Sequence, residues 1–342
     1  MSRKLIGGFF GLDLDILEET QDSIWMRWTN GASCALDFEN ARSALAYLFS
    51  QKKPEKIWLP AYICSEAAPP GFSYEFYPAD PLHGVDLDFL TGHAAAGDAV
   101  LTMNYFGRVP SSDVLEFIKS RPDILWVEDR CHTLWSDAPV YGDWAVYSPR
   151  KLAGVADGGL LVSYHDEVPA PDYAPPNASG VNPARMRYED KDQSHNDLWY
   201  PAYQKSEAGM AVSLRSISEE SRNILQNLPL LPLAEARKRN AKALMQLLKG
   251  IKGIKILPLG DVPFCVPVLL EGADAEEIAA NMARSGVFCA RHWVNLAAPA
   301  EISPQSHDLA RKLLSLPCDH RYDERDMKIV ADTLKNALSV LK

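Results

Sequence analysis

Short apolar runs alternate with amphipathic stretches along most of the chain. An apolar run of strand length that ends in a turn predicts a strand, and apolar positions at helical spacing predict a helix. Runs of the first kind cover residues 34–38, 56–60, 74–77, 99–104 and 124–129. Because these runs are apolar almost throughout and alternate with helical stretches, they predict an α/β fold with a largely parallel sheet.

The helices between these strands have recognisable ends. One helix is predicted to begin after Asn40, because asparagine is a good N-cap residue. A second helix is predicted to open at 61–65, and an amphipathic third helix covers 111–120. Their positions between strands support the α/β organisation.

The second half of the chain repeats this alternation on a smaller scale. A helix over 232–249 has Pro232 in its first turn and Gly250 just past its end. The elements predicted after it are strands at 253–257, 264–270 and 287–290 and helices at 274–285, 306–315 and 323–340. We therefore expect an N-terminal arm over 1–34, a large domain over 35–227 and a smaller C-terminal α/β domain over 228–342.

Residues 166–204 depart from the alternation. The stretch opens with several prolines and continues with closely mixed charges. A long segment of this kind is either functional or mobile. We expect an irregular loop near the functional site, with helical character returning over 199–212.

Composition excludes several classes of protein. The chain has 342 residues, 47% of them hydrophobic and 23% charged, which is enough apolar material for two domains. A net charge of -10 without a basic cluster argues against nucleic acid or a membrane surface as a partner. Six scattered cysteines without a C-x-x-C pair fit reduced thiols of a cytoplasmic protein better than disulfides or a zinc site, so no metal is expected. Acidic residues interrupt the N-terminal apolar stretch, and no run has membrane-spanning length.

The stretch 146–162 is the most informative part of the sequence. Lys151 lies in a tight turn between two apolar strand-like runs, with Ser148 before it and a glycine pair after it. Partial desolvation of an amine lowers its pKa toward neutrality. A neutral amine is a nucleophile that forms a Schiff base with a carbonyl, including that of pyridoxal 5'-phosphate (PLP). The alternative is a hairpin whose turn carries a solvated lysine.

PLP needs more than an amine from a protein. Its pyridine nitrogen needs a carboxylate, which Asp129 can supply from the end of a buried strand. His132 lies just beyond and can contact the cofactor ring or its hydroxyl. Alternatively, Asp129 pairs with Arg130 or accepts from a backbone group, and His132 has a structural role.

The phosphate of PLP is best held by a helix start that carries hydroxyl groups. Arg42 and Ser43 open the helix after Asn40, and Ser148 precedes the lysine. Each serine can instead be a cap or turn residue. Because ligands of parallel sheets lie beyond the carboxyl ends of the strands, we expect these groups along one rim together with Asn104.

Several segments together resemble the DegT-type sugar aminotransferases, a family of fold-type-I PLP enzymes. Residues 127–133 resemble the family's Glu-Asp-x-Ala-His segment, and Ser148-Pro149-Arg150-Lys151, followed by Asp157-Gly158-Gly159, resembles its lysine segment. Weaker similarities occur at 59–62, 104–107 and 315–322. The resemblance covers roughly residues 5–165 and 213–340.

The resemblance implies fold type I, with a large domain whose mixed, mostly parallel sheet is flanked by helices and a smaller C-terminal α/β domain. It implies that Lys151, Asp129 and His132 are catalytic. The residues implied to hold the cofactor are Lys151, Asp129, His132, Ser148, Arg42, Ser43, Tyr62 and Cys64.

The chain departs from the family pattern in three places. Arg42 stands where the family often has glycine, which puts a cation near the phosphate. Cys64 falls where an aromatic residue usually stacks on the ring, and Tyr62 is the nearest aromatic. Residues 180–186 match only loosely the segment that reaches the partner's phosphate in the family, where Asn182 would be the contact.

The resemblance implies a cytoplasmic homodimer that transfers an amino group from a glutamate-like amino acid to a keto-sugar, most simply a nucleotide-linked one. A lysine at position 151, where some sugar dehydratases of the family have histidine, favours transamination. Two alternatives remain: another PLP reaction (lyase, decarboxylase or aldolase) and a non-catalytic PLP-binding relative. Candidate anion contacts are Arg185, Arg187, Arg215, Arg291 and His292.

Overall fold

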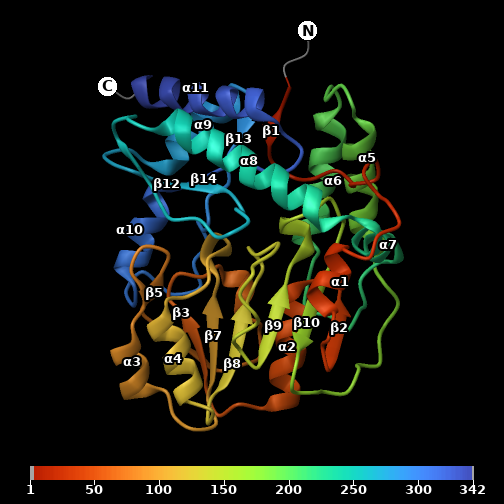
Figure 1. Cartoon of the computed structure of the whole chain (residues 1–342), viewed down its shortest axis with the longest axis vertical. Helices are drawn as coiled ribbons and strands as arrows, with labels where there is room; N and C mark the ends of the chain where they lie inside the picture. Colours follow the sequence, from red (N-terminus) through yellow and green to blue (C-terminus); the bar gives the residue numbers. More distant parts are fainter. Residues whose placement is uncertain (1–3, 341–342) are drawn as a thin grey trace.

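A seven-stranded sheet forms the lower half of the molecule in Figure 1. The computed structural model describes residues 4–340. The strand order is β2-β10-β9-β8-β7-β3-β4, in which β10 is antiparallel to β2 and β9 and all other neighbours are parallel. The strands are β2 (Cys34–Phe38), β3 (Ile57–Pro60), β4 (Tyr74–Tyr77), β7 (Ala99–Met103), β8 (Leu125–Asp129), β9 (Trp144–Tyr147) and β10 (Gly159–Ser163). The predicted mixed, mostly parallel sheet is confirmed.

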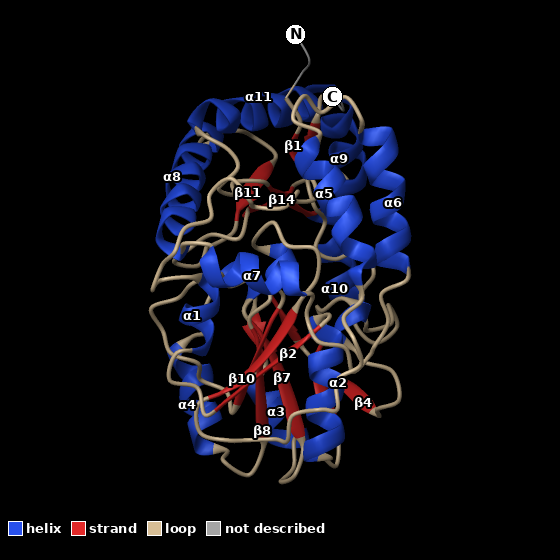
Figure 2. Cartoon of the chain, turned by 90° about the vertical axis from the view of Figure 1, so that its right-hand side faces the viewer, coloured by secondary structure: helices blue, strands red, loops and turns tan. Residues whose placement is uncertain are grey.

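Helices cover both faces of this sheet (Figure 2). Leu101 and Val127 point to the face that packs on α2, whereas their neighbours Val100 and Trp126 point to the face of α3 and α4. Since strand side chains alternate between faces, this explains why the strands are apolar throughout. The flanking helices are α1 (Ile24–Thr29), α2 (Ala41–Lys52), α3 (Leu87–His93), α4 (Ser112–Ser120) and α7 (Glu219–Asn227).

The upper half contains a three-stranded antiparallel sheet, β11-β12-β14. Its elements and neighbours are α8 (Leu230–Leu248), β11 (Ile254–Ile256), β12 (Val266–Leu270), α9 (Ala275–Arg284), β13 (Val287–Phe288), α10 (Pro304–Lys312), β14 (Leu313–Leu316) and α11 (Glu324–Val340). The N-terminal strand β1 (Ile6–Gly7) pairs with β13, so the arm begins in this half and then descends to pack Trp28 near the large sheet. The exact domain boundaries stay a prediction. No helix within residues 4–340 has both the length and the apolar character needed to cross a membrane.

The predicted irregular loop over 166–204 is wrong for its second part. Two helices, α5 (Val181–Glu189) and α6 (Asn196–Ala208), pack against each other there. The indole of Trp199 is 6% exposed and donates to Asp190 in the link between the helices, 3.1 Å away. Trp199 is thus a buried aromatic residue that connects α5 and α6. The exposed residues of this segment are mostly polar, so the sequence shows little helical periodicity.

Two further elements differ from the prediction. Residues 61–64 do not open an α-helix, because their extended backbone binds the segment around Leu296, and only a 3-10 turn follows at Ser65–Ala67. The helix predicted over 306–315 ends at Lys312, and residues 313–316 form β14, which is buried against β12. A short apolar run is compatible with a helix or a strand, and here pairing with β12 makes residues 313–316 a strand.

The start of β10 lies directly against the start of α2. A Cβ on Gly159 would lie 2.2 Å from the carbonyl carbon of Asn40 and 2.3 Å from the nitrogen of Ala41. Gly158 has a φ of +131°, which a residue with a side chain rarely adopts. The glycine pair therefore allows the sheet to touch the helix start beside the lysine turn.

We predict that Gly159→Ala lowers the free energy of unfolding by about 1–3 kcal/mol or more, because backbone atoms cannot give way to the new methyl group. The control is Gly92→Ala in α3, where no atom outside the helix lies within 4 Å of the new Cβ. That change should raise stability by about 0.5–1 kcal/mol, since alanine is the better helix former. Urea unfolding of both variants checks this, and equal stabilities would contradict it.

Candidate active site

The carboxyl ends of four parallel neighbours, β3, β7, β8 and β9, meet at the upper edge of the large sheet (Figure 1). The chain that leaves these strands carries Tyr62, Asn104, Asp129 and Ser148, and Lys151 follows one turn later. The shared rim expected from the sequence is therefore present.

Lys151 ends a single 3-10 turn, Pro149–Lys151, in the connection between β9 and β10. The connection is a hairpin, as the alternative interpretation held, but its lysine is half-buried rather than solvated. The amine lies 5.8 Å from the centre of the Trp293 ring. The preceding residue, Arg150, is held by an ion pair with Glu207 of α6 at 2.5 Å. The ion pair thus anchors the turn to α6, while Lys151 lines a cavity.

The charge of Lys151 depends on competing surroundings. Burial lowers the pKa of the amine, but Cys131, Cys64 and Asp129 outweigh this, so the pKa lies above its ordinary value. Burial in turn raises the pKa of both thiols. The expectation that desolvation alone brings the amine to neutrality is wrong for this arrangement.

Asp129 does not form an ion pair with the adjacent Arg130, because Arg130 pairs with Glu128 instead. Arg130 pairs with Glu128 at 3.2 Å, and Glu128 also accepts from Asn104 at 2.8 Å. The carboxylate of Asp129, a residue that is 5% exposed, accepts from the backbone N–H of Cys131 at 2.8 Å and forms no ion pair with an arginine or lysine among the described residues. The alternative of an Asp129–Arg130 pair is therefore wrong, and the backbone contact is present.

His132 is fully buried in a stack of aromatic rings. Its imidazole lies nearly parallel to Phe264 at 4.1 Å between ring centres, with Trp293 at 5.2 Å. Its Nε2 is buried and has no hydrogen-bond partner within residues 4–340. Burial lowers the pKa of His132 well below its ordinary value, followed by the effect of the Lys151 charge. A buried neutral imidazole with a free nitrogen is suited to contact a ligand.

The start of α2 is covered by a segment that the sequence did not associate with it. Ser43 donates to Asn40 at 3.0 Å and accepts from the backbone N–H of Ser213, also at 3.0 Å. Arg42 forms an ion pair with Glu66 and donates to the carbonyl of Met210 at 3.0 Å. A phosphate at this helix start would have to replace these internal contacts. Whether Arg42 and Ser43 hold a phosphate stays a prediction.

The residues expected to stack on a cofactor ring lie under a C-terminal segment. Tyr62 is fully buried and donates its hydroxyl to the carbonyl of His292. The backbone of Cys64 pairs with Leu296. Trp293 lies against Tyr62 at 5.8 Å and is the aromatic ring found beside the lysine amine. Sequence reasoning missed Trp293, although the neighbouring His292 drew attention to this segment.

A cavity of about 810 Å³ opens above Lys151. Of the candidate anion contacts, Arg187 and His292 line it. The others are engaged elsewhere: Arg185 pairs with Glu220, Arg215 donates to Pro175, and Arg291 pairs with Glu276. Asn182 is exposed on α5, and Ser213 is the residue that reaches the start of α2.

Arg237 of α8 connects two segments of this site. It is 1% exposed and donates to the carbonyl of Leu152 at 2.7 Å and to that of Phe264 at 3.1 Å. Leu152 follows Lys151, and Phe264 stacks on His132. Arg237 is thus a positioning residue that sequence reasoning missed, because a helical arginine has no local signature of burial.

These side chains fit the aldehyde and ring of PLP. Lys151 offers an amine, Asp129 a buried carboxylate, and His132 a buried imidazole with an unpartnered nitrogen. The backbone N–H groups at the start of α2 and the hydroxyl of Ser148 are the groups that would hold the phosphate.

We predict that Arg237→Met lowers the free energy of unfolding by about 2–4 kcal/mol, because it leaves several buried carbonyls without their charged donor. Arg239→Met is the matched control, since Arg239 is exposed on the same helix. That change should alter stability by less than about 0.5 kcal/mol. Urea unfolding measures both values, and a loss below about 1 kcal/mol for Arg237→Met would contradict the positioning role.

A second prediction concerns pH. Burial, with the Lys151 charge nearby, lowers the pKa of His292 from 6.5 to about 3. Below pH 6.5 the unfolded chain binds this proton and the folded protein does not, so stability should fall as the pH drops. Between pH 7.5 and pH 5 this group alone should cost about 2 kcal/mol. Urea unfolding at both pH values should show a smaller loss for His292→Asn, and an equal loss would refute the assignment.

Solved structures share this architecture over nearly the whole chain. The sugar aminotransferase CalS13 from Micromonospora echinospora is 16% identical, with 98% of this chain and 100% of that chain covered and a TM-score of 0.64. Spr1654 from Streptococcus pneumoniae, described as a sugar aminotransferase and solved in its PLP form, is 13% identical, with coverages of 98% and 100% and a TM-score of 0.67. DesI, solved in the presence of its TDP-sugar product, is 19% identical, with coverages of 90% and 81% and a TM-score of 0.63.

No protein-family model and no curated protein sequence matches the chain. The similarity to the solved structures thus lies in the arrangement of the helices and strands. The chain has the fold of the fold-type-I PLP-dependent aminotransferases.

Proposed function

We propose that this protein is a PLP-dependent aminotransferase of the DegT type, which transfers an amino group from a glutamate-like amino acid to a nucleotide-linked keto-sugar. The observation that carries the proposal is the group formed by Lys151, Asp129 and His132. A half-buried amine lines a large cavity, and a buried carboxylate and a buried imidazole lie near enough to interact with its charge. These are the groups that a cofactor with an aldehyde and a pyridine ring requires.

Each of these residues has a separate task in the proposed reaction. When bound, PLP supplies an electron sink that acidifies the α-proton of an amino acid. Lys151 holds the aldehyde at rest, and its amine afterwards takes the proton from the substrate's α-carbon and returns it. Asp129 keeps a proton on the pyridine nitrogen, since a buried carboxylate favours a cation beside it. The aromatic rings around His132 exclude water from this side of the site.

The substrate class is supported by the similar structures rather than by a single contact. One of them holds a TDP-sugar product, and the others are named as sugar aminotransferases. The cavity of about 810 Å³ has room for a ligand of that size. We further propose that the protein acts in the cytoplasm as a homodimer, with a partner subunit approaching the start of α2.

The test is Lys151→Ala, with Lys119→Ala as the control because Lys119 is exposed on α4. Wild type and control, incubated with PLP and reduced with borohydride, should carry a stable adduct at Lys151 that mass spectrometry identifies. Lys151→Ala should lack that adduct and should release keto acid from glutamate at least about 100-fold more slowly, because the positioned base is lost. An adduct at another lysine in wild type, or one retained in the variant, would overturn the assignment of Lys151.

A further inference from the structure

The cavity above Lys151 carries more positive than negative groups. Its cationic side chains are Arg150, Lys151, Arg187, Arg237 and Arg321, and its carboxylates are Asp197, Glu207 and Asp319. A cation inside a protein needs an anion or several hydrogen-bond acceptors. The partners of each arginine therefore show which one is left for a ligand.

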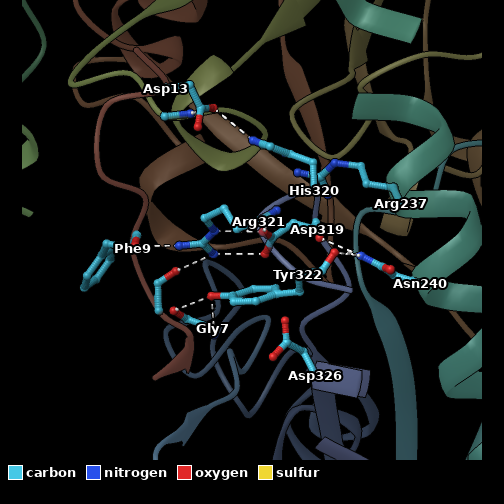
Figure 3. Close-up of polar contacts among 12 residues, drawn as sticks. Gly7, Phe9, Asp13, Arg237, Asn240, Asp319, His320, Arg321, Tyr322 and Asp326 are labelled. Carbon is cyan, nitrogen blue, oxygen red and sulfur yellow. Dashed lines mark hydrogen bonds and ion pairs between the residues drawn. The ribbon is translucent and has the colours of Figure 1, made fainter. Parts of the chain in front are cut away.

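Three of the four arginines are engaged by the protein. Arg150 pairs with Glu207. Arg321 pairs with Asp319 at 2.7 Å and donates to the carbonyl of Phe9 at 2.8 Å, so it holds the N-terminal arm (Figure 3). The third, Arg237 on α8, donates through its two terminal nitrogens to the backbone carbonyls of Leu152, Pro263 and Phe264.

Arg187 of α5 is the exception. Its guanidinium lies over the ring of Trp199, 4.4 Å from the ring centre, and donates to the side-chain oxygen of Asn196 at 3.3 Å. Within residues 4–340 no carboxylate forms an ion pair with it. Asp190, the carboxylate whose charge acts on Arg187, accepts instead from the Trp199 indole at 3.1 Å and from the backbone N–H of Ser194 at 2.9 Å.

The surroundings make the Arg187 charge unfavourable as it stands. Burial lowers the pKa of Arg187, and the charge of Arg321 lowers it further. An anion in the cavity would relieve both effects. Stacking on Trp199 also fixes the plane of the guanidinium in advance, so little side-chain entropy is lost on binding.

We propose that Arg187 binds the anionic group, a carboxylate or a phosphate, of the small molecule that enters the cavity above Lys151. This inference rests on the proposed function only in taking that cavity as the substrate site. Phe9 and Tyr203, whose ring centres are 3.6 Å apart, line the same cavity and provide an apolar wall for the remainder of the ligand.

The experiment measures binding rather than turnover. The PLP-loaded protein is titrated by calorimetry with inorganic pyrophosphate and, separately, with glutarate, which distinguish a phosphate source from a carboxylate source. At least one anion should bind to wild type, and Arg187→Gln should weaken that binding about 10- to 100-fold, since hydrogen bonds between charged groups have this strength. Arg187→Lys should retain part of the affinity, because it keeps the charge but not the planar pair of donors.

Arg185→Gln is the matched control, since Arg185 lies on the same helix but is exposed and paired with Glu220. It should bind the anions like wild type. If wild type binds neither anion, or if both glutamine variants bind alike, the assignment of Arg187 is wrong. Binding that depends on Arg187 in a protein without aminotransferase activity would support this inference and overturn the proposed function instead.

Discussion

One fully buried guanidinium determines how the parts of the site meet. Arg237 comes from α8, beside the small sheet, yet its hydrogen bonds go to Leu152 after β9 and to the 263–264 segment. A buried charge is costly unless acceptors surround it, so these carbonyls can bind it only in one relative arrangement. Arg237 therefore links the lysine turn to Phe264, the residue whose ring stacks on His132. The position of the Lys151 amine thus depends on how the upper half of the molecule packs against the edge of the large sheet.

The same proximity controls the charge of the amine. Asp129 favours the ammonium form of Lys151, whereas burial and Arg150 oppose it. A pyridinium beside Asp129 would offset part of this negative charge, and burial would then have the larger effect on the pKa of a free Lys151 amine. A carboxylate with no arginine partner is suited to this exchange, because Arg130 is already neutralised by Glu128. The Glu128–Arg130 pair thus leaves Asp129 free to respond to a cofactor.

The sequence predicts what depends on local pattern. The strands that end before Asn104, Asp129 and Ser148 are continuous apolar runs, and parallel pairing then brings their ends to one edge. Trp293 and Ser213 escaped prediction because each reaches the site through contacts with residues more than a hundred positions away. The helix α5 was missed for a related reason, since its buried residues Pro183 and Ala184 give no periodic pattern, whereas the helical character expected from Trp199 onward is confirmed as far as Ala208 in α6. Local sequence patterns thus predicted the candidate residues at the strand ends, whereas the residues that surround them depend on tertiary contacts.

The residues proposed for the chemistry and the residues that line the cavity come from different parts of the chain. The amine and its carboxylate lie on the sheet edge, in the part of the chain that resembles the DegT-type family. The cavity wall opposite comes from α5 and α6, which lie in the stretch where that resemblance lapses, and from the arm around Phe9. Changes in α5 and α6 can alter the cavity wall without disturbing the strands that carry Lys151 and Asp129. Ligand choice is therefore expected to vary with α5 and α6, while the chemistry stays with the sheet edge.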